Sequence, residues 1–263
     1  MTNDTYQTYV SDQTRWYNAA TGWDRVTVDG IVSVGFSDTT YLASATGSTT
    51  AGPTFASGQS IVFGMYVISL PGTGGGIFVN FGSGNITSGW ILGNSTVNSN
   101  KFRLLFKGVN SDANIELNLT LTTGYHVIAV ANLGTSCRAS LDGGTVVATA
   151  AMSGSYVAPS GATLFAIGRY FGAGGLACAW MRFGFFQAYG SALSDGDLQT
   201  LSGNGANYIP GVISAAPTYD LQARWMRTEG IASGVSAWQI YGTSSSKSSY
   251  VSAQGGGIAK VFY

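Results

Sequence analysis

The sequence predicts an all-β protein built from antiparallel sheets, and two observations carry this prediction. Short runs of apolar and β-branched residues recur along the chain, and each is bounded by Gly, Asn, Asp or Ser, as strands joined by turns are. Residues 124–130, 137–143 and 164–169 are three such runs, and a longer apolar run follows at 176–189. Hydrophobic residues make up 45% of the 263 residues, which is enough for the core of one large domain.

Other strand-like runs precede this central stretch. We expect the main domain to begin with a strand at residues 31–36. Residues 61–70 are apolar at both alternating positions, which predicts a central strand covered on both faces. Four further strands are expected, at residues 77–81, 90–92, 101–106 and 114–119.

A tight hairpin is predicted around residue 142. Asp142, Gly143 and Gly144 separate the strand-like runs 138–141 and 145–149. Asp-Gly supplies the residues of positive φ that a two-residue hairpin turn needs.

One short helix is predicted after the apolar run that ends at residue 189. Ser194 is placed to cap its first turn, and Asp195 and Asp197 suit the positive end of a helix. Leu198 and Leu201 give it one apolar face, and Gly203 is placed to end it.

The two ends of the chain differ from the centre. Residues 1–30 hold aromatic residues without a clear period, which predicts an arm. Strand-like runs at residues 221–226, 237–241, 250–251 and 258–263 either join the main sheet or form a separate extension over residues 206–263, which we favour. Uncovered aromatic residues need a partner surface. We therefore expect assembly contacts at four tryptophans, Trp16, Trp23, Trp225 and Trp238.

The order of the runs over residues 31–205 resembles the laminin-G-like family. The family's F-T-I-x-A-W-V strand corresponds to residues 61–67, and its W-H-H-V-A-V strand to residues 125–130. Its Y-V-D-G, I-G and A-L-S-x-x-E-I motifs correspond to residues 140–143, 167–168 and 192–198. The resemblance implies a concanavalin A-like jelly-roll β-sandwich of two antiparallel sheets, with irregular N- and C-terminal extensions. We expect the space between the sheets to be filled by Phe63, Val67, Val127, Ala129, Leu141, Ile167 and Phe183.

The sequence argues against an enzyme. A retaining glycosidase needs two carboxyl groups about 5 Å apart. The chain has two glutamates, Glu116 and Glu229, and Asp112 lies about 13 Å from Glu116 if the segment between them is a strand. His126 is the only histidine, and we interpret it as a structural strand residue.

Metal and disulfide signals are weak. Cys137 and Cys178 are too few for a disulfide framework, and one histidine with two cysteines cannot complete a zinc site. Asp142 is a weak candidate for part of a calcium site. We therefore expect no cofactor.

Glycan binding would need aromatic faces and amides on loops or on one face of the sandwich. The candidates are Trp90, Asn94, Tyr156, Tyr170 and Phe171. Packing at the rim of the domain is the alternative role for all five.

Composition narrows the function. Charged residues are 9%, against about 25% in ordinary domains, and the net charge is zero, which favours association and gives no basic surface for nucleic acid. No apolar run is long enough to span a membrane and no signal peptide is recognised. We therefore expect a structural component of a phage or virus particle surface, a capsid decoration protein or a tail or fibre subunit, made in the host cytoplasm and bound to other virion subunits or to copies of itself. The alternative is a carbohydrate-binding adhesion module that recognises cell-surface glycans.

Overall fold

The structure is a computed structural model of the chain. It describes residues 4–8, 25–28, 31–35, 42–43, 53–70, 76–83, 87–98, 100–112, 115–159, 163–168, 180–204, 213–215, 217–222 and 239–243. Regular structure within these residues is almost entirely β-strand, with one α-helix, α1 (Asp195–Gly203). In this part of the chain, no helix is long and apolar enough to cross a membrane.

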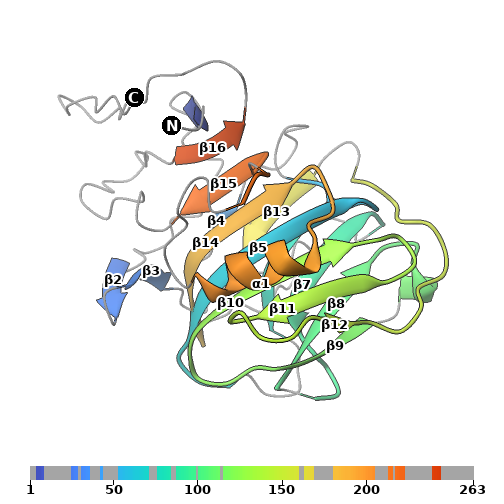
Figure 1. Ribbon diagram of the computed structural model, residues 1–263, viewed down its shortest axis with the longest axis horizontal. Coiled ribbons are helices and arrows are strands. Elements are labelled where there is room, and N and C mark those ends of the chain that lie inside the picture. The colour runs from blue at the N-terminus through green and yellow to red at the C-terminus, as the bar shows by residue number, and fades with distance from the viewer. Residues whose placement is uncertain are drawn as a thin grey trace.

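The strands form two antiparallel sheets (Figure 1). Among the described residues, the larger sheet has ten strands, in the order β1-β16-β15-β14-β5-β10-β11-β12, with β3 on β14 and β2 on β3. The smaller sheet has six, in the order β4-β13-β6-β7-β8-β9. The bounds are β1 (Asp4–Thr8), β2 (Arg25–Val28), β3 (Ile31–Gly35), β4 (Leu42–Ala43), β5 (Gln59–Val67), β6 (Ile77–Ser83), β7 (Gly89–Asn94), β8 (Lys101–Phe106), β9 (Ile115–Thr120), β10 (Gly124–Asn132), β11 (Cys137–Leu141), β12 (Val147–Ala148), β13 (Thr163–Ile167), β14 (Met181–Tyr189), β15 (Tyr219–Gln222) and β16 (Gln239–Thr243).

The strand pairing is nested. In the larger sheet β3 and β5 pair with β14, and in the smaller sheet β4 and β6 pair with β13. Early and late strands of the chain thus pair in both layers, and the chain crosses between the layers from β5 to β6 and again from β13 to β14. This is the wrapping of a jelly roll, so the predicted all-β jelly-roll sandwich is confirmed.

Strand β5 is the centre of the larger sheet. It pairs with β14 along one edge and with β10 along the other, and residues 60–65 are all buried. The prediction of a central strand covered on both faces is therefore confirmed.

Aromatic rings fill the space between the sheets. The ring of Phe63 in β5 stacks on that of Phe78 in β6, with centroids 6.2 Å apart. Phe186 of β14 lies 6.1 Å from Trp90 of β7 and 5.2 Å from Phe165 of β13. Because each pair joins strands of opposite sheets, these rings hold the two layers together.

Most of the predicted core residues lie between the sheets. Those in the core or packed at its edge are Phe63, Val67, Leu141, Ile167 and Phe183. The prediction was wrong for Val127 and Ala129, which lie on the outer face of β10, whereas Ile128 and Val130 face the core. Strand β10 is apolar at both alternating positions, so its sequence does not specify which set faces inward.

Helix α1 covers part of the outer face of the larger sheet, over β10 and β11 (Figure 1). The predicted cap is confirmed, because the Ser194 hydroxyl accepts a hydrogen bond from the Asp197 N–H at 3.2 Å. Leu198 and Leu201 are buried against the sheet, and the helix ends at Gly203 as predicted.

The predicted tight turn is also present. The Leu141 carbonyl accepts a hydrogen bond from the Gly144 N–H at 2.8 Å, and φ is 51° at Asp142 and 74° at Gly143. Two consecutive positive φ angles are those of a type I′ turn. The strand after the turn is shorter than predicted. It covers residues 147–148, where β12 pairs with β11, and the predicted strand covers residues 145–149.

The described strands of both chain ends belong to the larger sheet. β15 pairs with β14, β16 with β15, and β1 with β16, while β2 pairs with β3. For the C-terminal region, the sequence left open whether its strands join the main sheet or form a separate extension. Strands β15 and β16 join the main sheet. The predicted strands at residues 250–251 and 258–263 lie outside the described residues.

Candidate functional site

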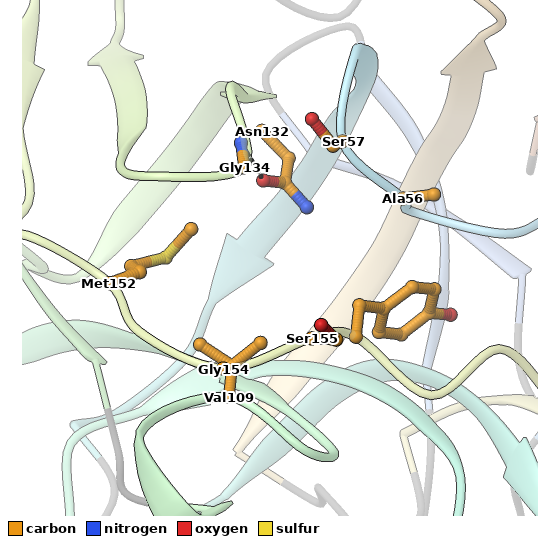
Figure 2. A pocket seen from close by; sticks show the side chains of 9 residues that line it. Ala56, Ser57, Val109, Asn132, Gly134, Met152, Gly154 and Ser155 are labelled. Atoms are coloured by element: carbon orange, nitrogen blue, oxygen red, sulfur yellow. Dashed lines mark hydrogen bonds between the residues drawn. The ribbon is translucent and has the colours of Figure 1, made fainter.

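A pocket opens at one end of the sandwich, where four connecting segments meet. Its volume is about 360 Å³. The segments are the loop before β5, the turn after β8, the turn between β10 and β11, and the connection after β12. Figure 2 shows the lining residues around a common space, with Met152 on one side and Ser155, Gly154 and Val109 beneath. The lining residues are Ala56, Ser57, Val109, Asn132, Gly134, Met152, Gly154, Ser155 and Tyr156.

Asn132 joins two of these segments. Its side-chain amide donates to the Phe55 carbonyl at 2.9 Å, and its side-chain oxygen accepts from the Gly134 N–H at 2.9 Å. The Asn132 backbone carbonyl also accepts from the Gly58 N–H at 2.7 Å. Asn132 is buried, and its three hydrogen bonds tie the loop before β5 to the turn between β10 and β11 at this end of the sheet.

The pocket has an apolar base. Val109 and Met152 are buried in the main core, and the Tyr156 ring packs on Phe106 with centroids 6.0 Å apart. The thiol of Cys137 lies 3.8 Å from the Met152 sulfur. Burial raises the pKa of the Cys137 thiol to about 12, so this group is a neutral packing contact at physiological pH.

The rim of the pocket is polar and accessible. The Ser57 and Ser155 side chains are exposed, whereas the neighbouring Asn132 amide is buried. Leu133 and Val157, each next to a lining residue in the sequence, are 41% and 44% exposed. The site therefore offers the hydroxyl groups of Ser57 and Ser155 above an apolar base, an arrangement suited to a small polar ligand with C–H surface.

An unusual turn supports one wall of the pocket. Asn110, Ser111 and Asp112 have φ angles of 48°, 53° and 64°, a left-handed conformation that costs free energy for residues other than glycine. The Asn110 side-chain oxygen accepts from the Ser153 N–H at 2.8 Å, and the Ser153 carbonyl accepts from the Asn110 N–H at 2.8 Å. These bonds fasten the turn to the segment that carries Met152, Gly154 and Ser155.

Asp112 closes the same turn. Its carboxylate accepts from the Gly108 N–H at 2.7 Å and pairs with the Lys107 ammonium at 3.0 Å. The Gly108 hydrogen bond first, and then the Lys107 bond, lower the pKa of Asp112 below its usual value. The carboxylate therefore stays ionised and bonded at neutral pH.

The structure brings one of the five predicted glycan-contacting residues, Tyr156, to this pocket. Trp90 is fully buried, its indole N–H donates to the Pro53 carbonyl, and Asn94 is also fully buried. Neither has an exposed face on which a sugar could lie, so burial argues against these two predictions. Tyr170 and Phe171 lie outside the described residues.

The Asp142 carboxylate is occupied by protein groups. One oxygen lies 2.7 Å from Nδ1 of His126, and the other accepts from the Val127 N–H at 2.8 Å. The His126 Nε2 lies 3.0 Å from both the hydroxyl and the carbonyl oxygen of Thr122. These contacts make His126 and Asp142 a link between β10 and the turn after β11, and they argue against Asp142 as a calcium ligand. Among the described residues, no group of three or more His, Cys, Asp and Glu gathers as a metal site would require.

Of the glutamates and of the tryptophans expected to make assembly contacts, the structure describes Glu116. Glu116 is exposed on β9 and accepts hydrogen bonds from Ser95 at 2.8 Å and from Asn98 at 2.9 Å. Glu229 and Cys178 lie outside the described part of the chain. So do all four tryptophans predicted to make assembly contacts, Trp16, Trp23, Trp225 and Trp238.

Most of the pocket residues were not predicted from the sequence. Ser57, Asn132, Gly134 and Ser155 are common turn residues, and their types alone point to loops rather than to a site. They converge only because the jelly-roll pairing brings four separate connections to the same end of the sandwich.

No protein-family model and no curated protein matches the chain. Solved structures resemble it at low sequence identity. Domain 4 of the extracellular arabinanase AbnA from Geobacillus stearothermophilus is 12% identical, with a TM-score of 0.49 over 76% of this chain and 87% of that one. The CBM40 domain of the Ruminococcus gnavus IT-sialidase is 13% identical, with a TM-score of 0.44 over 65% of this chain and 96% of that one. For the leech intramolecular trans-sialidase the values are 14% and 0.44 over 57% of this chain, which spans 24% of that protein. At these identities the likeness concerns the β-sandwich and transfers no ligand or activity.

Proposed function

We propose that this chain is a non-catalytic carbohydrate-binding module and that a sugar occupies the pocket at the end of the sandwich. The observation that carries the proposal is the pocket itself. Its volume of about 360 Å³ falls within the range of small-molecule sites, and it presents the hydroxyls of Ser57 and Ser155 above the apolar side chains of Val109 and Met152. A sugar ring has the matching chemistry, with hydroxyl groups around its edge and C–H groups on its faces.

The lining residues also favour binding over hydrolysis. Glycoside hydrolysis needs a carboxylic acid and a second carboxylate at the scissile bond. The nine lining residues include no Asp, Glu or His. Asp112, which is close to Val109 in the sequence, is already bonded to Lys107 and Gly108. The pocket can therefore hold a sugar without supplying a proton donor or a nucleophile to it.

Glycan titration tests this proposal. The full chain is applied to an array of oligosaccharides, and the best ligands are measured by calorimetry. The AbnA domain named above was solved in complex with arabinotriose, which makes arabinan fragments a useful part of the array. We expect binding that weakens about tenfold in Ser57→Ala and in Ser155→Ala, because each loses a hydrogen bond to the sugar.

The control is Thr123→Ala, which changes an exposed hydroxyl beside the first residue of β10, at the other end of that strand from Asn132. This variant should bind as the wild type does. The proposal fails if no glycan binds, or if the Ser57→Ala/Ser155→Ala double variant, with an unchanged thermal midpoint, binds as tightly as the wild type.

A structural role at the surface of a phage or virus particle is a separate proposal. It is supported by the 9% of charged residues, the net charge of zero and the aromatic residues of the chain ends. A glycan-binding module can serve in such a position, so the two proposals are compatible. The oligomeric state of the chain tests the second one.

A further inference from the structure

Among the described residues that line the pocket, none carries a charge at neutral pH. Its nine lining residues are aliphatic, hydroxyl, amide, thioether, phenol or glycine, and burial raises the pKa of the Tyr156 phenol further above its usual value. On this basis, and resting on the proposed function, we propose that the site selects uncharged saccharides and rejects sugars that carry a carboxylate or a sulfate.

The charged residues near the lining segments are engaged elsewhere. Lys107 and Arg138 are the cations within four positions of a lining residue in the sequence. The Lys107 ammonium lies 3.0 Å from the Asp112 carboxylate, and Arg138 is paired with Asp195 of helix α1. Neither cation is thus available to neutralise an anionic sugar in the pocket without giving up its own partner.

Because a bound sugar loses part of its hydration, the lack of an unpaired cation disfavours an anionic ligand. An ionised carboxylate that leaves water needs a cation or several hydrogen-bond donors, and an unpaired one costs much more than an unpaired hydroxyl. The side-chain amide of Asn132 already donates to the Phe55 carbonyl, and the Gly134 N–H already donates to Asn132. The remaining groups, such as the Ser57 and Ser155 hydroxyls, both donate and accept, which suits the hydroxyls of a neutral sugar.

Matched ligands test the inference. Each neutral hexose oligosaccharide on the array is placed beside the uronate in which a carboxylate replaces the C6 hydroxymethyl group, and both are titrated into the full chain. We expect the neutral member to bind at least about tenfold more tightly. We also expect its affinity to change little between low and high salt, because no charge pair is formed.

A second experiment adds a positive charge to the pocket and measures the preference for neutral over anionic sugars again. Ser155→Lys adds one cation at the exposed rim of the pocket and should narrow or reverse the preference for the neutral sugar. Thr123→Lys adds the same charge at an exposed position at the start of β10 and should leave the preference unchanged.

The outcomes separate the two proposals. If neither member of any pair binds, the proposed glycan function itself is wrong. If glycans bind but the uronates bind as well as the neutral sugars, or if Thr123→Lys shifts the preference as much as Ser155→Lys does, glycan binding stands and selection by the uncharged pocket is overturned.

Discussion

At the scale of single residues, Asp142 shows how one side chain holds two strands in place. It adopts a positive φ of 51°, and its two carboxylate oxygens bind the His126 ring and the Val127 N–H. Its own N–H donates to the Val127 carbonyl at 2.9 Å. The residue thus connects the start of β10 to the turn after β11, and its carboxylate serves the fold rather than a ligand.

We expect Asp142→Ala to lower the free energy of unfolding by about 1–3 kcal/mol, since the Val127 N–H and Nδ1 of His126 lose the carboxylate as a partner. Asp142→Asn should cost less, because the amide oxygen can still accept one of these bonds and asparagine tolerates a positive φ. Urea unfolding of both variants measures the difference. Equal losses in the two variants would mean that the position depends on the carboxylate charge, which both variants remove, and neither on one retained hydrogen bond nor on the tolerance of asparagine for a positive φ.

At the scale of elements, the left-handed turn of residues 110–112 determines the position of one pocket wall. Asn110 bonds to Ser153, whereas the Ser111 side chain is exposed and supports nothing comparable. Asn110→Ala should therefore lower the free energy of unfolding by about 0.5–1.5 kcal/mol and weaken glycan binding, because the segment carrying Ser155 loses its side-chain anchor.

Ser111→Gly is the matched control in the same turn. Glycine adopts φ of 53° without a steric cost, although it also gains freedom in the unfolded chain, so its net effect on stability should stay within about 1 kcal/mol. Glycan affinity should not change in this variant. Chemical unfolding and calorimetry on the two variants test the prediction. It is wrong if Asn110→Ala leaves the affinity intact, or if Ser111→Gly lowers it equally.

Local signals explain what could be predicted from the sequence. The Asp142-Gly143 turn, the Ser194 cap and the two-sided strand β5 each depend on neighbouring residues, and all three were predicted correctly. The inward face of β10 and the pocket depend on which strands pair across the sheet. That pairing cannot be read from periodicity, and therefore Val127 was assigned to the wrong face and Asn132 was not recognised as a pocket residue.

At the scale of the whole molecule, the strands of the two chain ends lie at one side of the larger sheet. Among the residues whose burial the structure describes, the main core runs from Phe55 to Ala188. The terminal strands instead extend the larger sheet beyond β14. The segments around them contain Trp16, Trp23, Trp225 and Trp238, four of the six tryptophans.

We therefore expect residues 31–205 to fold alone but to remain monomeric, whereas the full chain associates through its ends. Burial of one large apolar side chain contributes about 1.5–3 kcal/mol, so four tryptophans are enough to drive a specific interface of at least about 1,000 Å². Light scattering after size exclusion measures the mass of both proteins, and circular dichroism checks that the shorter one is folded.

Removal of β15 exposes one edge of β14 at residues 185–188, so aggregation of the short form is measured at several concentrations. A full chain that is monomeric at micromolar concentration would argue against self-assembly and leave the module as an isolated binder. If the short form instead forms the same oligomer as the full chain, the contacts lie on the sandwich and not on the tryptophan-rich ends.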